Sequence, residues 1–398
     1  MKKKFKNFTS ILLTLMLILG VGTIVPLEVG ATEITSGVFS YTVLDDGTAE
    51  ITNYTGLETQ LEIPSEIDGY TVTSIGACAF RDCENLTSVT IPDSVTSIDI
   101  GAFLNCANLA SVIIGDNLTN IGPSVFEGCV SLKNITIPDS VTSIGHRAFL
   151  GCSSLVNITI PDSVTSINDY TFYGCSRITS ITIPDGVTSI KENAFSLCRS
   201  LVNVTIPDSV TEIESNAFSS CSALANITIP DSVTSIKNDT FAFCDSLVNI
   251  TIPDSVTNIC DSAFFFCTSL TSITIPDSVT KIGSWAFRDC ENLKDVYYSG
   301  SKDAWDGIYI ADGNKCLKNA VIHFNGKGSS PVETIVGDVT GDGKISILDA
   351  VAIQKYIAGF SSLTGEQISV ADVNNNGKVD ILDVALIQKY IVGLIPSL

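Results

Sequence analysis

The sequence predicts a repeat solenoid followed by a small helical module. A motif of the form Phe-x-x-Cys recurs ten times at a constant step of 23 residues, and an acidic twelve-residue segment near the C-terminus returns 34 residues later. The composition agrees, because 45% of the 398 residues are hydrophobic and only 16% are charged. A chain of this length and apolar content can bury two domains, or one elongated array with a small module.

The first 31 residues have the pattern of a secretory signal peptide. Residues 11–25 form a nearly uncharged apolar run, which is short for a membrane-spanning helix of about 20 residues. Small residues, Val29-Gly30-Ala31, stand where a signal peptidase would cut, and the run is preceded by the lysines Lys2, Lys3, Lys4 and Lys6. We expect residues 1–31 to be removed by cleavage after Ala31, so that the mature, secreted protein begins at Thr32.

Each 23-residue unit is expected to form one coil of the solenoid. In the unit around residue 158, Ile158 and Ile160 alternate with polar residues, which is the period of a half-buried strand. Pro161 ends this strand, because proline has no N–H group to continue a parallel ladder. A unit so short cannot bury its own apolar face, so it must stack on its neighbours.

These repeats resemble the BspA-type leucine-rich repeats of bacterial surface and secreted proteins. Residues 58–298 carry the Leu-x-x-Ile-x-Ile strand, the Pro-Asp-x-Val-Thr-x-Ile return and the Ala-Phe-x-x-Cys closure in constant register. The resemblance implies a curved solenoid with a parallel β-sheet on its concave side. It also implies adhesion or protein binding as the general role.

Both ends of the array depart from the repeat, as the capping units of a solenoid must. Residues 32–57 are expected to form an N-terminal β cap, with a hairpin that turns at Asp46-Gly47. Residues 299–325 are expected to form an aromatic-rich C-terminal cap. The Gly-, Ser- and Pro-containing segment 326–335 is interpreted as a linker.

Thirteen cysteines occur, and ten of them stand at one phase of the repeat. One cysteine per coil at a constant position predicts an inward-facing row, where buried thiols behave as small apolar groups. Free thiols are therefore favoured over disulfides, which remain the alternative for a secreted chain. Cys78, Cys260 and Cys316 do not follow the repeat and are expected to be exposed or paired.

Charge and histidine content exclude several classes of function. The chain has 22 Lys and Arg against 43 Asp and Glu, a net charge of −21, which argues against binding to a nucleic-acid backbone. His146 and His323 are the only histidines, so a multi-histidine zinc site or a histidine dyad is not expected. The outward strand positions are mostly Ser, Asn and Thr, which favours a solvated polar sheet over a ligand groove.

The C-terminal 60 residues contain two twelve-residue loops with the spacing of calcium sites. Oxygen-bearing side chains stand at alternate positions, glycine stands at the sixth position for a sharp turn, and the seventh residue offers its carbonyl group. Each loop has three carboxylates, so we expect two bound Ca²⁺ ions. The expected ligand positions are Asp338, Thr340, Asp342, Lys344, Ser346 and Asp349 in the first loop, and Asp372, Asn374, Asn376, Lys378, Asp380 and Asp383 in the second.

Each loop runs into one expected helix, and residues 336–398 resemble a type I dockerin of cellulosomal proteins. That resemblance implies a small all-α calcium-loop module that binds a cohesin on a scaffoldin subunit. The implied partner contacts are Ile347, Leu348, Gln354 and Lys355 in the first copy, and Ile381, Leu382, Gln388 and Lys389 in the second. Such duplication is compatible with docking in two orientations. For Leu348 and Leu382, burial in the helix core is an equally good interpretation.

Three interpretations of function follow from the sequence. The first is a secreted, non-catalytic cellulosome component whose solenoid is a protein- or carbohydrate-binding or spacer surface. The second is a cellulosomal enzyme that degrades polysaccharide or peptide, but the recurrent aspartates after proline, such as Asp139 and Asp162, are explained by turn chemistry. The third is a surface adhesin, which we expect less because no wall-sorting signal or anchor helix follows Leu394.

Overall fold

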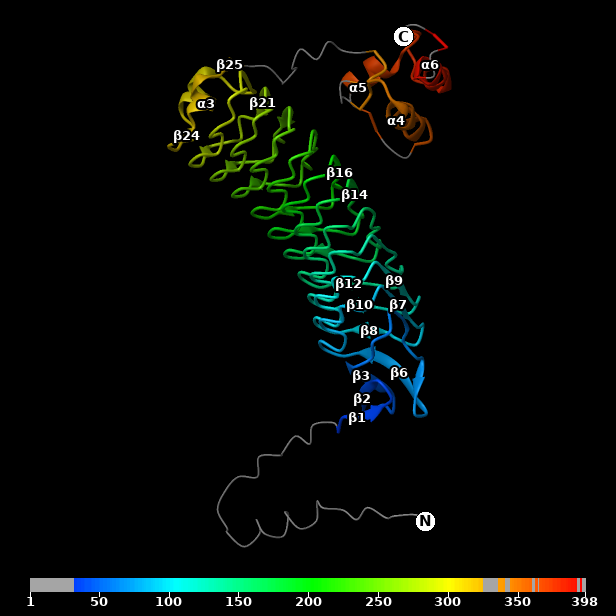
Figure 1. The fold of residues 1–398 in the computed structure, drawn as a ribbon. Coiled ribbons are helices and arrows are strands. Elements are labelled where there is room, and N and C mark those ends of the chain that lie inside the picture. The colour runs from blue at the N-terminus through cyan, green and yellow to red at the C-terminus, as the bar shows by residue number, and fades with distance from the viewer. Residues whose placement is uncertain are drawn as a thin grey trace, which may run out of the picture.

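The structure is a computed structural model, and it describes residues 32–324, 336–340, 344–359, 362–363, 365–391 and 394–395. The expected signal segment and the linker 326–335 lie outside the described residues. Residues 32–324 form a curved stack of coils, and short helices follow in the C-terminal region (Figure 1). No helix among the described residues has both the length and the apolar character needed to cross a membrane.

The N-terminal residues form a small antiparallel sheet that covers the first coil. Strand β2 (Phe39–Val43) pairs antiparallel with β1 (Ile34–Ser36) and with β3 (Ala49–Tyr54), so the expected hairpin is present. Strand β3 then pairs in parallel with β6 (Tyr70–Ile75), and this pairing joins the hairpin to the stack. The short β5 (Glu66–Ile67) pairs antiparallel with β6.

One parallel ladder, which is divided into three separate sheets, is built from strands at the positions that the alternation of isoleucines predicts. The coils of Ile158 and Ile227 have no strand there, so the expectation for the coil of Ile158 is not met beyond an isolated bridge between Asn134 and Asn157. Ser88 pairs with Ser111 and Val89 with Val112, so residues 23 apart lie side by side. The strands of this first ladder are β4 (Gln60–Glu62), β7 (Ser88–Ile91), β9 (Ser111–Ile114), β11 (Asn134–Ile135), β14 (Ser180–Thr182), β16 (Asn203–Thr205), β19 (Asn249–Thr251), β21 (Ser272–Ile275), β23 (Asp295–Tyr298) and β25 (Val321–Phe324).

A second parallel ladder, also divided among three sheets, runs along the same stack, and the sequence analysis did not anticipate its strands. Each strand has two residues, and the second is an isoleucine that is buried in every strand but the last, as in the pairing of Ser97 with Asn120 and Ile98 with Ile121. Its strands are β8 (Ser97–Ile98), β10 (Asn120–Ile121), β12 (Ser143–Ile144), β13 (Ser166–Ile167), β15 (Ser189–Ile190), β17 (Glu212–Ile213), β18 (Ser235–Ile236), β20 (Asn258–Ile259), β22 (Lys281–Ile282) and β24 (Tyr309–Ile310).

The core of the stack contains a column of phenylalanine rings, one from each coil. Neighbouring rings from Phe80 to Phe287 are stacked with centroids 4.9–5.9 Å apart and interplanar angles of 5–17°. Each ring is fully buried, so every coil covers the apolar face of the one before it. Stacked aromatic pairs stabilise a core beyond their buried area alone.

The cysteine row lies beside this column, and its thiols are free. From Cys106 to Cys290, each Sγ donates a hydrogen bond of 3.0–3.3 Å to the carbonyl oxygen of the preceding coil's core phenylalanine. These nine cysteines are buried, and Cys83 at the start of the row is half-buried. Of the three cysteines that do not follow the repeat, Cys78 is exposed, Cys260 and Cys316 are half-buried, and none is paired.

Two short helices close the C-terminal end of the solenoid, and both ladders continue through this end. Strand β24 pairs with β22, and β25 pairs with β23. Helix α2 (Lys302–Asp306) lies between β23 and β24, and α3 (Lys315–Asn319) lies between β24 and β25. The side chain of the buried Asn314 makes hydrogen bonds that the backbone of a further coil would otherwise make. Its Oδ1 accepts from the backbone N–H of Phe287, and its Nδ2 donates to the carbonyl oxygen of Gly283.

The C-terminal region is helical. Helices α4 (Ile347–Ile357) and α6 (Ile381–Ile391) pack together, and α5 (Gly365–Ala371) lies between them in sequence. Their small core contains Val339, Ala350, Ile353, Ala371, Val384 and Ile387. The predicted fold class, a parallel β-solenoid followed by a small all-α region, is therefore confirmed.

Candidate calcium-binding and partner-binding site

Helix α4 begins with a capping box that also organises the first loop. Ser346 is the N-cap, and its Oγ accepts a hydrogen bond from the backbone N–H of Leu348 at 3.1 Å. Asp349 reaches back, so that its Oδ2 accepts from the backbone N–H of Ser346 at 2.7 Å. A carboxylate at this point also interacts favourably with the helix dipole.

The other oxygen of Asp349 holds the start of the loop. Oδ1 accepts from both the backbone N–H and the hydroxyl group of Thr340, each at 2.8 Å. The first loop is therefore closed on itself by one carboxylate, with Ser346 on one side and Thr340 on the other. Asp338, the first position of the loop, is almost fully buried. Asp342 lies outside the described residues.

The second loop repeats this arrangement. Asp383 accepts from the backbone N–H of Asp380 at 2.9 Å and from that of Asn374 at 3.2 Å. Asp372 accepts from Asn376 and Gly377 at 2.9 and 2.7 Å, which curls the loop around its first carboxylate. The φ of Gly377 is +82°, a conformation that glycine adopts without strain, as the sixth position requires.

The donor set of both loops suits a hard divalent cation. Asp349 and Asp383 are fully buried, and within the described part of the chain neither forms an ion pair with a basic side chain. A buried carboxylate without a counter-charge is costly unless a cation neutralises it. Ca²⁺ prefers such carboxylate, amide and carbonyl oxygens, and the backbone of the second loop is curled around Asp372.

Most of the expected ligand positions are described, and their side chains differ in surroundings. Asp338, Asp349 and Asp383 are buried, whereas Ser346, Asp372, Asn374 and Asp380 are half-buried. The exposed positions are Thr340, Lys344, Asn376 and Lys378. No group of three His, Cys, Asp or Glu side chains in the described residues lies close enough to hold a metal by itself. In the second loop, the amide oxygen of Asn374 accepts from the backbone N–H of Asn376 at 3.0 Å, and that of Asn376 accepts from the backbone N–H of Lys378 at 2.9 Å.

The two helices expose matching side chains at their first turns. Ile347 and Leu348 are 54% and 59% exposed, and Ile381 and Leu382 are 59% and 58% exposed. The alternative that Leu348 and Leu382 belong to the helix core is wrong. The buried residues begin one position later in each helix, at Asp349 in α4 and at Asp383 in α6. Two turns later on each helix, a polar pair is also exposed: Gln354 with Lys355, and Gln388 with Lys389.

Helix α5 is an element that the sequence analysis missed. It has seven residues and lies between the two loop–helix units, where Gln367 Nε2 donates to the carbonyl oxygen of Val339 at 3.1 Å. The backbone N–H of Gly337 also donates to the carbonyl oxygen of Val370 at 2.8 Å. The segment Gly365–Ala371 thus fastens the start of the first loop to the chain that enters the second.

Comparison with known families agrees with this arrangement. The model of the BspA type leucine rich repeat region matches residues 53–179 and 165–294, together more than half of the chain. The chain belongs to the BspA-type leucine-rich repeat family. A second model, the dockerin type I domain, matches residues 336–392. This BspA-type protein therefore carries a type I dockerin at its C-terminal end.

Solved structures of other bacterial leucine-rich repeat proteins are similar to the solenoid. A leucine rich cell surface protein from Faecalibacterium prausnitzii is 32% identical, with 70% of this chain and 97% of that chain covered and a TM-score of 0.37. The T. pallidum leucine rich repeat protein is 34% identical over 48% of this chain and 91% of that chain, with a TM-score of 0.46. A Bacteroides ovatus leucine-rich repeat protein is 25% identical over 73% and 99%, with a TM-score of 0.38. Among curated proteins, none matches the chain.

Proposed function

We propose that this protein is a secreted, non-catalytic component of a cellulosome-type assembly, whose dockerin binds a cohesin module of a scaffoldin in a calcium-dependent way. The observation that carries the proposal is the duplicated pair of exposed apolar residues, Ile347-Leu348 and Ile381-Leu382, each next to a fully buried loop carboxylate. Exposed apolar side chains that are grouped on one element are typical of an interaction surface.

Calcium would be held by two sets of groups that this chain supplies. Asp338, Thr340, Asp342, Ser346 and Asp349 would hold one ion, with the carbonyl group of Lys344. Asp372, Asn374, Asn376, Asp380 and Asp383 would hold the other, with the carbonyl group of Lys378. A bound ion supplies positive charge that offsets the buried carboxylates. Asp349 and Asp383 then fix the first turns of α4 and α6, and this orients the exposed pairs toward the partner.

The solenoid is proposed to present a binding or spacer surface rather than an active site. Its recurrent aspartates lie in turns, as at Asp93, whose Oδ1 accepts from the backbone N–H of Asp116 at 3.0 Å. This hydrogen bond makes Asp93 part of a coil-to-coil contact, and a turn after proline suits aspartate at the other positions. An activity screen of the chain from residue 32 onward on polysaccharides and peptides tests this part, and specific hydrolysis would contradict it.

The binding proposal is tested with the chain from residue 32 onward against a panel of cohesins. Binding is measured by calorimetry in calcium and after addition of a chelator. We expect at least one cohesin to bind with a dissociation constant below about 1 µM, and binding to be lost in chelator. The double variant Asp349→Asn/Asp383→Asn should lose binding in calcium, and the matched solenoid variant Asp139→Asn/Asp162→Asn should keep it. Failure of every cohesin to bind would overturn the proposal.

A further inference from the structure

The turns that close the coils contain two positions with a left-handed backbone. In all ten coils, the residue two before and the residue two after the core phenylalanine have φ between +54° and +75°. Small or polar residues suit this conformation, and they occupy the two positions in most coils, as Asn105, Asn193, Asn216 and the glycines 128, 151 and 174 illustrate.

Near the C-terminal end of the solenoid, large aromatic residues occupy these positions instead. Phe243, Phe266 and Trp285 have φ of +59°, +61° and +59°. The left-handed region is unfavourable for bulky side chains. The core gains little in return, because the rings are 40%, 40% and 49% exposed. Neither backbone preference nor burial therefore explains aromatic residues at these three sites.

The three rings belong to one surface, which we call the aromatic platform: Phe243, Phe265, Phe266, Trp285 and Arg288. The ring of Phe243 lies 5.2 Å from that of Phe265 and 5.5 Å from that of Phe266, measured between centroids. The Cζ atom of Arg288 lies 5.8 Å from the centroids of both Phe265 and Trp285. The platform thus spans three successive coils without a gap.

The indole ring of Trp285 is held in place by the cap. A Cβ atom at Gly313 would lie 1.8 Å from Cδ1 of Trp285, so only glycine allows the ring this close to the chain. The backbone N–H of Trp285 donates to the carbonyl oxygen of Asp312 at 2.9 Å, which fixes the same contact from the other side. A half-exposed ring that is fixed before binding loses little conformational entropy on contact with a ligand.

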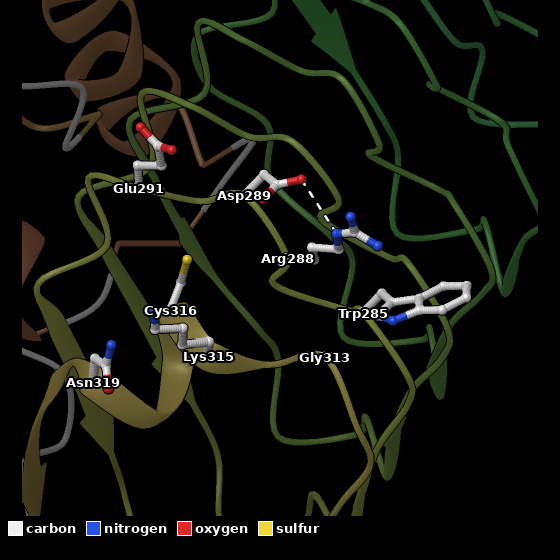
Figure 2. Close-up of a pocket in the computed structure, with 8 residues that line it drawn as sticks. All are labelled: Trp285, Arg288, Asp289, Glu291, Gly313, Lys315, Cys316 and Asn319. Atoms are coloured by element: carbon white, nitrogen blue, oxygen red, sulfur yellow. Dashed lines mark ion pairs between the residues drawn. The ribbon is translucent and has the colours of Figure 1, made fainter.

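A pocket of about 500 Å³ lies next to this ring, a size in the range of small-molecule sites. Trp285 stands at one end, and Lys315, Cys316 and Asn319, from α3 and its neighbourhood, stand at the other (Figure 2). Asp289 and Glu291 add carboxylate oxygens to the lining. The pocket therefore combines one flat apolar wall with several hydrogen-bond donors and acceptors.

The charges of the pocket favour a neutral ligand. Arg288 Nε lies 3.3 Å from Asp289 Oδ2, so the guanidinium group is already paired. Glu291 and the net charge of −21 oppose polyanions such as nucleic acids and acidic polysaccharides. A pyranose ring has an apolar C–H face for an indole and a rim of hydroxyl groups for carboxylate and amide groups. We propose that the aromatic platform and this pocket bind a neutral polysaccharide.

This inference deepens the proposed function by naming the ligand class of the solenoid surface, and it rests on that function only for its biological context. The strand faces carry mostly Ser, Asn and Thr side chains, whereas the turns carry the aromatic residues. The neutral polysaccharide would lie along the turns at the C-terminal end, over the coils that contain Phe243, Phe266 and Trp285.

The test uses native electrophoresis of the chain from residue 32 onward in gels that contain hydroxyethyl cellulose, glucomannan, xyloglucan or, as the anionic comparison, polygalacturonate. We expect at least one neutral polysaccharide to retard the protein. Trp285→Asn should weaken this retardation at least tenfold, and the triple variant Phe243→Asn/Phe266→Asn/Trp285→Asn should abolish it. These variants should fold, because asparagine occupies the same positions in other coils. The control Tyr170→Asn removes an aromatic residue at the same phase, five coils before Trp285, and should change nothing.

A second readout is the fluorescence of Trp285. The chain has two tryptophans, and Trp305→Phe leaves Trp285 alone while it keeps a ring against Tyr298. The bound polysaccharide should protect this indole from acrylamide quenching.

Absence of retardation by every neutral polysaccharide, retardation by polygalacturonate alone, or equal retardation of the triple variant would overturn the proposal. The variant Asp349→Asn/Asp383→Asn should retain polysaccharide binding, so failure of the dockerin proposal is separable from failure of this one.

Discussion

Thr340 donates its backbone N–H and its hydroxyl group to the same carboxylate oxygen of Asp349, at 2.8 Å each. At the corresponding point of the second loop, the backbone N–H of Asn374 donates to Asp383 at 3.2 Å. The third position of the first loop is therefore a short, neutral hydroxyl group already engaged with the last ligand. This difference distinguishes two loops that are otherwise close copies.

We expect the first loop to bind Ca²⁺ more weakly than the second. Thr340→Asp adds a carboxylate to the first loop, and the affinity of such loops rises with the number of charged ligands, so the weaker of the two dissociation constants should fall on the order of tenfold. Calorimetric titration of the calcium-free protein measures both constants. The matched change Asn374→Asp in the second loop should strengthen the tighter site instead. Equal constants in the unaltered protein would contradict the expectation.

Removal of calcium should unfold the dockerin and leave the solenoid folded. Without the ions, Asp349 and Asp383 are buried carboxylates with no counter-charge, whereas the core of the solenoid is apolar. Scanning calorimetry in calcium and in chelator should therefore show one transition that shifts or disappears and one that stays within about 1 °C. A single transition that moves as a whole would show that the two parts unfold together.

The duplicated helices should allow the dockerin to bind in two orientations. Replacing Ile347 and Leu348 with alanine, or replacing Ile381 and Leu382, should each weaken cohesin binding by only about threefold. Replacing all four should weaken it at least a hundredfold, because both copies are then changed. Titration calorimetry gives the affinities, and far-UV circular dichroism checks the helices. If either single-copy variant alone abolished binding, only one orientation would be used.

The buried thiols should make the solenoid less stable at alkaline pH. Burial raises the pKa of Cys198 to about 12 and drives the pKa of Cys175 well above its ordinary value. Above about pH 8.5, the unfolded chain loses thiol protons that the folded chain keeps, so the free energy of unfolding falls by up to about 1.4 kcal/mol per pH unit for each such thiol.

This stability is fully present below about pH 8.5 and is lost progressively as the pH rises toward the folded pKa. Urea unfolding between pH 7 and pH 10.5 under reducing conditions measures the effect. Cys175→Ala/Cys198→Ala should be less stable than the unaltered protein at pH 7, and its stability should fall less steeply with pH. The same slope in both proteins would contradict the explanation. In the folded protein at pH 8, a thiol reagent should modify the exposed Cys78 before any buried cysteine of the row.

Much of the solenoid could be predicted from sequence because one period governs it. The alternation of apolar and polar residues predicted strands such as Ser88–Ile91 and Ser272–Ile275, and the constant phase of the cysteines predicted their inward position. In the unit of Ile158 and Ile160 the expected strand is absent, and the structure has only an isolated bridge between Asn134 and Asn157. The second ladder was missed because each of its strands has two residues, such as Ser97–Ile98, which are too few for a period to be recognised. Each of these strands pairs with a strand of the next coil, so its formation depends on the stacking of coils and not on the sequence of one unit.

The helices show a different limit. The sequence left open whether Leu348 and Leu382 are buried in the helix core or exposed to a partner. Packing of α4 against α6 buries Ala350, Ile353, Val384 and Ile387 instead. The aromatic platform was not predicted either, because Phe243 and Trp285 differ from ordinary core aromatic residues only in their positive φ and their exposure, which the sequence does not reveal.

The column of stacked phenylalanines has a consequence for how such a rod can change in length. Every ring sits on an equivalent ring, so the surface left after deletion of one whole 23-residue unit would match the surface that received it. An insertion or deletion of this size would lengthen or shorten the molecule by one step and leave both end units unchanged. The length of the solenoid is therefore adjustable by duplication or deletion of whole units within the gene.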